Sequence, residues 1–293
     1  MSASMRKALH GYLPVLGIFV LACGENATAP APRNATAIRG SSVPASFAAA
    51  NVAASSLTGR IAYTTGTIHV YNLATNTDVD LRVSGVNPKF SPDGTLITCQ
   101  CSGIKVMNAD GTGQRVLTPT GGVPSFDPSG TRIAFDNNGI WKINVDGTGL
   151  TKLTANGHWP SWSPDGTQIV YGAPVGKLGQ LFIMNADGTN QHQALTSGSV
   201  IDVVWQPSSK ILFGVLNGNY DLYSYDPANS SSLTRLTTSK DSDFEPSWSP
   251  DGTQISWTDL TSGKTAGIWV MNADGTGKQG PVISKGRQGS WGR

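Results

Sequence analysis

Glutamate is almost missing from this chain: only Glu25 and Glu245 occur among its 19 acidic residues, and the rest are aspartates. Asp favours turns, where its short side chain bonds the nearby backbone, whereas Glu favours helix surfaces. Charged residues make up only 14% of the sequence, while 35 of the 293 residues are Gly and 17 are Pro. This composition indicates an all-β chain of short strands and frequent turns.

Clustered positive charge is lacking too. The formal net charge is +2, and removal of a leader that contains Arg6 and Lys7 would bring it to zero. We therefore expect no nucleic-acid partner. The sequence contains no G-x-S-x-G nucleophile elbow and only four His. We expect neither a cofactor nor an enzymatic activity.

No apolar run is long enough to cross a bilayer, which takes a helix of about 20 residues. The run 13–22 has ten residues, follows Arg6 and Lys7, and is typical of an export signal over residues 1–22. It ends in Val20-Leu21-Ala22-Cys23, which resembles the lipobox of bacterial lipoproteins and implies lipidation of Cys23. The alternative is an ordinary secretory signal with a coincidental cysteine.

The segment that follows is poor in bulky apolar side chains. Residues 23–57 are rich in Ala, Ser, Thr, Pro and Asn, so burial would not offset the entropy lost on ordering them. We expect a flexible tether. Residue 24 is Gly where Asp retains enterobacterial lipoproteins in the inner membrane. The sequence therefore favours the periplasmic face of the outer membrane, or the cell surface, with the membrane contacted only through the lipid.

From residue 58 onward the chain repeats itself six times. Three markers recur in fixed order, and periods of about 40 residues built from strands are typical of a β-propeller. The first marker is an aromatic: Phe90, Phe126, Trp162, Trp205, Trp248 and Trp291. The second is an Ile: Ile61, Ile97, Ile133, Ile169, Ile211 and Ile255. The third is Asn or Asp: Asn72, Asn108, Asn144, Asn185, Asp226 and Asn272.

Turn motifs place four strands, A to D from the centre outward, in each repeat. Ser-Pro-Asp-Gly, first seen at residues 91–94, joins strands A and B, and Asp-Gly pairs such as 110–111 join C and D. The first repeat lacks strand A, and the chain ends on one at Trp291. We predict that residues 58–293 form one six-bladed propeller, closed by pairing of the C-terminal strand with the N-terminal blade.

The repeat P-S-W-S-P-D-G-T-Q-I, followed by W-V-M-N-A-D-G-T-G, resembles that of TolB-type propellers. The resemblance covers about 235 residues and implies a periplasmic, monomeric protein that engages partner segments, Pal among them. TolB also carries a globular α/β domain before its propeller, where this sequence has the tether. Some TolB-like propellers are oligogalacturonate lyases, whose metal needs several histidines. Among the His, we expect His69 to pack within its blade and His192 to be solvated, which leaves only His158 near the channel.

The candidate site lies where the chain departs from its own repeat. Turns on one face are nearly identical, whereas the D–A and B–C connections on the other face vary. The B–C connections of blades 4 to 6 are longer, with the additions at 172–179, 215–219 and 258–267. Scaffold loops often carry function, although drift in solvated loops would also give such variety. The expected partner-binding residues at this channel mouth are Asn87, His158, Trp159, Asp202, Phe244, Glu245, Arg287 and Gln288.

Several alternatives remain open from sequence. The first is a non-enzymatic envelope scaffold that binds a protein or peptide. The second is a glycan-binding or lyase-like propeller with Trp159 and Phe244 as stacking platforms. A weaker third is a Ca²⁺ site in which Asp202 and Glu245, with Asn87 and Gln288, supply oxygens. Cys99 and Cys101 either form a local disulfide or are two small residues in a tight hairpin.

Overall fold

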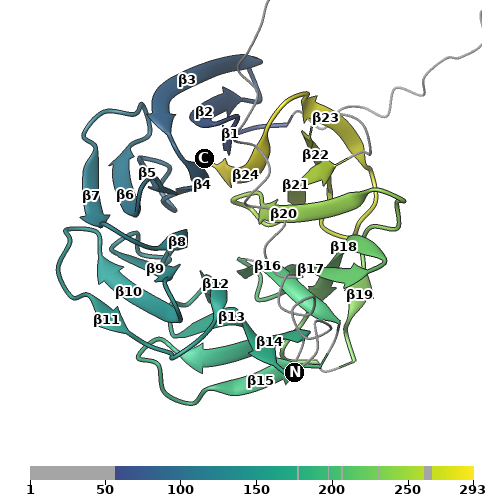
Figure 1. Ribbon diagram of the computed structural model, residues 1–293. Coiled ribbons are helices and arrows are strands. Elements are labelled where there is room, and N and C mark those ends of the chain that lie inside the picture. Colours follow the sequence, from purple (N-terminus) through teal and green to yellow (C-terminus); the bar gives the residue numbers. More distant parts are fainter. Residues whose placement is uncertain (1–56, 177, 197, 206, 230, 261–265) are drawn as a thin grey trace, which may run out of the picture. The chain divides into compact units, whose positions relative to one another are not determined.

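The computed structural model describes residues 57–293, except 177, 197, 206, 230 and 261–265. The expected signal segment, Cys23 and all of the expected tether but Leu57 lie outside the described residues. The described part forms six antiparallel four-stranded sheets set as blades around a central axis (Figure 1). The predicted six-bladed propeller is confirmed. No helix long and apolar enough to cross a membrane occurs in this part of the chain.

The first three blades, from the centre outward, have the following strands. Blade 1 holds β24 (Arg287–Gly292), β1 (Arg60–Thr64), β2 (Thr67–Asn72) and β3 (Thr77–Ser84). Blade 2 holds β4 (Val86–Phe90), β5 (Leu96–Gln100), β6 (Ile104–Asn108) and β7 (Arg115–Thr118). Blade 3 holds β8 (Gly122–Phe126), β9 (Arg132–Asp136), β10 (Ile140–Asn144) and β11 (Thr151–Lys152).

The other three blades follow the same order. Blade 4 holds β12 (His158–Trp162), β13 (Gln168–Val175), β14 (Leu178–Asn185) and β15 (His192–Leu195). Blade 5 holds β16 (Ser199–Trp205), β17 (Ile211–Asn217), β18 (Asn219–Tyr225) and β19 (Thr234–Arg235). Blade 6 holds β20 (Ser242–Trp248), β21 (Gln254–Leu260), β22 (Gly267–Asn272) and β23 (Gln279–Ile283).

The Ser-Pro-Asp-Gly turn closes through its own side chains. In blade 2 the Gly94 N–H donates to the Ser91 carbonyl at 2.8 Å, and Gly94 has a φ of 72° that suits glycine. The Ser91 hydroxyl accepts the Leu96 N–H at 2.9 Å, and Asp93 accepts the Thr95 N–H at 3.0 Å. These bonds use the donors that a tight hairpin would otherwise leave unpaired.

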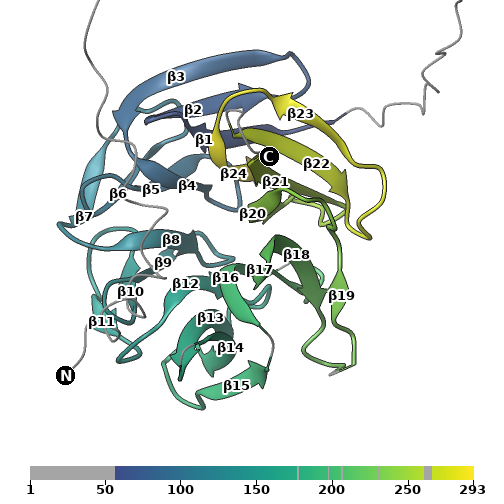
Figure 2. The ribbon, with the colours of Figure 1, turned by 45° about the vertical axis from the view of Figure 1, so that its right-hand side comes forward.

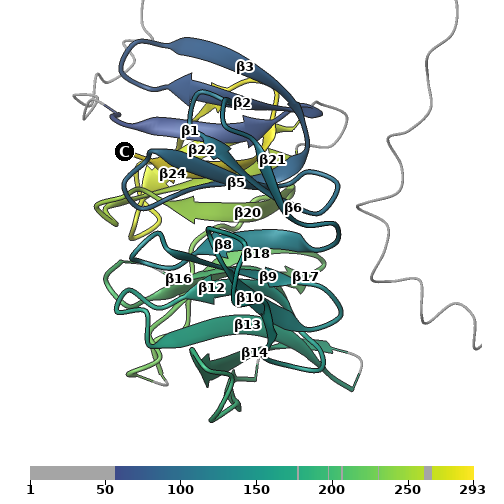
Figure 3. The ribbon, with the colours of Figure 1, turned by 90° about the vertical axis from the view of Figure 1, so that its left-hand side faces the viewer.

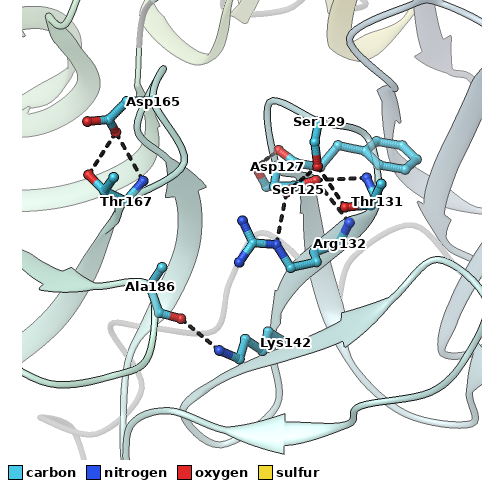
Figure 4. Close-up of polar contacts among 10 residues, drawn as sticks. Ser125, Asp127, Ser129, Thr131, Arg132, Lys142, Asp165, Thr167 and Ala186 are labelled. Carbon is cyan, nitrogen blue, oxygen red and sulfur yellow. Dashed lines mark hydrogen bonds and ion pairs between the residues drawn. The ribbon is translucent and has the colours of Figure 1, made fainter.

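Blade 3 carries the variant turn, with Asp127 in the place of the serine (Figure 4). Its buried carboxylate accepts the N–H groups of Thr131 and Arg132, both at 2.9 Å, and the Arg132 Nε at 2.9 Å. Ser129 donates its hydroxyl to the same carboxylate at 2.7 Å. Asp127 thus accepts both of the backbone N–H groups that Ser91 and Asp93 accept separately in blade 2.

The core lies between neighbouring blades. The six predicted Ile markers are fully buried, and the six aromatic markers are 4–8% exposed. Trp248, for example, packs with Leu212 and Leu222 of the preceding blade and with Met271 of its own. The residues identified from the sequence repeat alone therefore pack in the core between neighbouring blades.

The ring closes where its two chain ends meet. Strand β24 pairs antiparallel with β1, with Ile61 opposite Trp291, and all three ribbon views place the two strands side by side (Figures 1, 2 and 3). The Trp291 indole Nε1 donates to the Thr58 carbonyl at 2.9 Å. The predicted closure by the C-terminal strand is confirmed.

Candidate binding mouth of the channel

A cavity of about 430 Å³ runs along the propeller axis, lined by the innermost strand of every blade. We call the side with the D–A and B–C connections the mouth face, and the side with the A–B and C–D turns the turn face. Five of the eight predicted mouth residues line the cavity: Asn87, Trp159, Asp202, Glu245 and Gln288. His158, Phe244 and Arg287, the residues just before three of these, do not.

One residue of each innermost strand has a left-handed backbone, and together these six form what we call the mouth ring. Their φ angles are 52° at Asn87, 40° at Val123, 54° at Trp159, 51° at Asp202, 55° at Glu245 and 60° at Gln288. Asn and Asp adopt this conformation comparatively often, whereas Val, Trp, Glu and Gln rarely do, and it costs roughly 1–2 kcal/mol for a non-glycine residue. The pairing of each innermost strand shifts register at the same place, as in a β-bulge that re-aims a side chain.

Hydrogen bonds run round the mouth ring from blade to blade. Asp202 Oδ2 accepts the Glu245 N–H at 3.1 Å, and Glu245 Oε2 accepts the Gln288 N–H at 3.0 Å. Gln288 Oε1 in turn accepts the Asn87 N–H at 2.9 Å. The polar side chains predicted to contact a partner therefore also hold the mouth of blades 5, 6, 1 and 2 in place.

Charges inside the channel lie on three blades. Burial and the neighbouring Glu245 carboxylate raise the pKa of Asp202 to about 7. Desolvation lowers the pKa of Lys89, and the Asp202 and Glu245 carboxylates partly offset this effect. Glu245 Oε1 accepts the Arg287 Nη2 at 3.0 Å. Glu245 is thus paired, whereas Asp202 is a carboxyl that gains or loses its proton near neutral pH.

Blade 4 contributes an aromatic and a histidine. Asp136, at the end of β9, accepts the Trp159 N–H at 3.2 Å and lies 3.4 Å from His158 Nδ1. The interaction with the Asp136 carboxylate raises the pKa of His158. The Trp159 ring is half-buried, 5.5 Å from the His158 ring, and borders the cavity. Trp159 thus offers an aromatic surface at the mouth.

Phe244 is placed differently from the prediction that gave it a surface role. Its ring is 7% exposed, lies edge-on to Tyr220 at 6.4 Å, and has the Arg287 guanidinium 5.1 Å from its centroid. Neighbouring residues of a strand alternate in direction, so Phe244 packs inside the blade while Glu245 points to the channel. Phe244 and Arg287 therefore support the mouth from within the wall.

The added residues of blades 4 and 5 extend strands more than loops, and in blade 6 β21 and β22 pair as far as Asp259 and Gly267. β13 and β14 pair out to Val175 and Leu178, and β17 and β18 out to Asn217 and Asn219. These hairpins rise on the mouth face and carry exposed apolar side chains at or near their tips. The residues are Val175, Leu178, Leu216 and Leu260, each 41–48% exposed, and we call them the hairpin crown. The exposed apolar side chains of the hairpin crown lie on three adjacent blades only, so the mouth face is asymmetric.

The remaining residues considered from sequence, two histidines and two cysteines, make contacts within their own blades. His69 contacts the Tyr63 ring at 5.0 Å, and the exposed His192 bonds its neighbouring backbone. Cys99 and Cys101 form a disulfide, which settles the alternative left open from sequence. Among the described residues, no group of three or more His, Cys, Asp or Glu could hold a metal ion.

Two site residues were missed from sequence. Lys89 lies one layer below the mouth ring, where the other blades have Ser125, Ser161, Val204, Ser247 and Ser290. Aligning the six repeats on their aromatic would have singled it out. Asp136 follows an ordinary apolar strand, and nothing in the sequence signals its position beside Trp159.

The described chain is thus a six-bladed propeller whose central channel is lined by both polar and apolar side chains. Residues 160–289 match a family profile described as TolB beta propeller domain. This match confirms the resemblance to the TolB-type propeller repeat that the sequence motif predicted. No curated protein matches its sequence significantly.

Solved structures share the fold. TolB from Acinetobacter baumannii is 19% identical with a TM-score of 0.66, over 80% of this chain and 66% of that one. A putative TolB from Agrobacterium tumefaciens is 18% identical with a TM-score of 0.67, over 78% of this chain and 91% of that one. An oligogalacturonate lyase from Vibrio parahaemolyticus is 12% identical with a TM-score of 0.53, over 73% of this chain and 70% of that one. At such identities the likeness concerns the fold.

Proposed function

We propose that this protein is a non-enzymatic binding module of the cell envelope that captures a protein or peptide segment at its channel mouth. The mouth ring carries the proposal. Six equivalent residues share one costly backbone conformation, yet their side chains differ from blade to blade. Strained residues persist where the surroundings enforce them, and they cluster at ligand sites. Blade packing alone would be served equally well by one repeated residue.

The hairpin crown supports an offset of the site toward blades 4 to 6. Exposed apolar side chains on three neighbouring hairpins, beside Trp159 and the Asp202 carboxyl, combine anchor area with polar orientation. This composition is typical of protein interfaces, in which a few buried anchors carry most of the affinity. The TolB-like repeat favours a periplasmic location, and the expected lipid at Cys23 would hold the module to the outer membrane.

A crosslinking experiment identifies the partner. A photo-crosslinking amino acid at Leu178 should capture a discrete envelope protein, whereas the same group at Val79, exposed on the outer strand β3, should not. With that partner in hand, Trp159→Ala with Glu245→Gln should weaken binding at least tenfold, about 1.4 kcal/mol.

A matched pair on the turn face serves as the control. Asp110→Asn with Asp274→Asn changes two C–D turns and should leave the affinity unchanged. If the folded turn-face variant lost binding while the mouth variant kept it, the binding site would lie on the turn face and the proposal would be wrong.

A glycan remains the second candidate, favoured by Trp159 at the cavity and by the fold shared with the lyase. Titration with oligogalacturonate, followed through tryptophan fluorescence, distinguishes the two. Saturable quenching that Trp159→Ala removes would favour the glycan.

A further inference from the structure

The disulfide of blade 2 fills a place that an aromatic ring fills in the other five blades. Cys99 is fully buried two residues after the Ile marker of β5, and Cys101 is 5% exposed. The residues at the position of Cys99 in the other blades are Tyr63, Phe135, Tyr171, Phe213 and Trp257. A Cβ added at Gly85, the residue before β4, would collide with Cys101 Sγ. In blade 3 a Cβ added at Gly121, the residue before β8, would collide with the Phe135 ring. The disulfide therefore takes over the packing of a ring against the connection from blade 1.

Cys101 lies close to the surface of the mouth face, in the B–C turn of its blade. Its equivalents in blades 1 and 3 are the exposed Thr65 and the half-buried Asn137. The same backbone bond closes all three turns: the N–H of Thr65, Cys101 or Asn137 donates to the carbonyl two residues later, at 3.1, 2.8 and 2.8 Å. This hairpin thus accepts a side chain that points outward at this position. The bond to Cys99 keeps the Cys101 sulfur turned inward against Gly85.

Gln100, the residue between the two cysteines, connects the disulfide to the mouth ring. Its Oε1 accepts the Asn87 Nδ2 at 3.0 Å, and its backbone pairs with Val86, the residue before Asn87. The Asn87 N–H donates to Gln288 Oε1, so Asn87 joins blade 2 to blade 1. A cross-link between residues two apart closes a very short loop and constrains the unfolded chain little, so its main effect is on local conformation. The disulfide thus holds Gln100, and Gln100 holds Asn87.

We propose that Cys99–Cys101 is a redox site that a dithiol reductant opens, and that this opening releases the blade 2 part of the mouth ring. A thiolate of the reductant attacks Cys101 Sγ, the sulfur nearer the surface, and forms a mixed disulfide while Cys99 leaves as a thiolate and takes up a proton. The second thiol of the reductant then displaces Cys101. The protein gains two electrons and two protons, and the reductant becomes a disulfide. The freed Cys101 side chain turns outward as Thr65 does, so Gly85 loses its packing partner.

Thiol trapping tests the chemistry. The full chain carries Cys23→Ala, so that only the two blade 2 cysteines react. Millimolar dithiothreitol without denaturant, followed by iodoacetamide, should give alkylation of both cysteines within hours. Glutathione, a monothiol, should stop at the mixed disulfide, and fragment masses should place the glutathione on Cys101 and the alkyl group on Cys99.

Amide signals of the ¹⁵N-labelled chain test the effect on the mouth ring. On reduction, the backbone N–H groups of Gly85 and Asn87 should exchange with solvent at least about tenfold faster, because both lie in the segment that opens. The Asn87 side-chain amide signal should move toward its position in Gln100→Leu, which lacks the acceptor. The Asn219 side-chain amide, which donates to the Ser239 carbonyl on the opposite side of the ring, is the internal control and should not move.

Cys101→Thr gives blade 2 the residue that blade 1 has at this position. It should reproduce the reduced-state signals of Asn87 without any reductant and should not respond to dithiothreitol. Resistance of the native disulfide to dithiothreitol, glutathione on Cys99 instead of Cys101, or an unchanged Asn87 after complete reduction would each overturn the inference. Loss of all native signals on reduction would also overturn it, because the bond would then hold the whole fold. These measurements need no partner, so they stand apart from the test of the proposed function.

Discussion

Val123 is the most strained member of the mouth ring, since a β-branched side chain at a φ of 40° crowds its own backbone. Asn tolerates this conformation far better. Val123→Asn should raise the free energy of unfolding by about 1 kcal/mol, measured from the urea midpoint at unchanged slope. Val116→Asn, at an exposed strand position outside the left-handed region, should bring no gain. A Val123 variant no more stable than the wild type would show that the ring is not strained at this residue.

Asp243 should make stability depend on pH between about 4 and 6. Its buried carboxyl accepts the Trp257 Nε1–H at 2.8 Å, and desolvation raises its pKa to about 6. A carboxyl with a raised pKa binds its proton more tightly when folded, so stability increases as the pH falls from 6 toward 4. Asp243→Asn should remove this increase and should be at least as stable as the wild type at pH 7. Parallel pH profiles of melting temperature for the two proteins would contradict this assignment.

Single residues also mark the limit of what the sequence predicts. The aromatic and Ile markers were found because six copies align with one another. Lys89 stands in that alignment as well, but its position facing the cavity emerges only from the bulged innermost strand. The left-handed ring could not be predicted, because Val, Trp and Glu favour other conformations and nothing local signals the bulge. Phe244 was misplaced for the same reason, since a bulge changes which side chain points outward.

At the level of strands, β24 should contribute more to stability than any outer strand. Trp291 is 6% exposed, and its indole and backbone N–H groups donate to Thr58 and Ser247. Trp291→Ala should cost about 3–5 kcal/mol, measured by urea denaturation. Val79→Ala, on the exposed face of β3, should change stability by less than about 0.5 kcal/mol.

Deletion of residues 287–293 tests the whole strand. It would expose the pairing edge of β1 and the apolar flank of blade 1, so the melting temperature should fall sharply or folding should fail. An unchanged melting temperature would show that β24 does not close the ring.

The turns and this closure were predictable because each depends on a short motif or on counting strands. The long hairpins of blades 4 and 5 were expected as loops because the glycines at their tips, Gly176 and Gly218, hide the strand pattern.

For the molecule as a whole, we predict that Cys23 carries the lipid. Metabolic labelling with a palmitate analogue should mark the wild type, because the apolar run ends where a lipobox cysteine is expected, and Cys23→Ala should remove the label. Both proteins should show the same propeller stability, since residue 23 precedes the described fold. Equal labelling of the two would refute the lipid anchor and leave a secreted propeller.

The position of β1 inside blade 1 also sets how the propeller responds to pulling. The described fold begins on the turn face, where Arg60 donates to the carbonyls of Gly94 and Arg293. A force applied to the chain at residue 57 would load β1 first. This strand is bonded to β24 on one edge and to β2 on the other, so a single extension force must shear two sets of hydrogen bonds at once. Pairing with β24 thus lets β1 bear mechanical load on both of its edges.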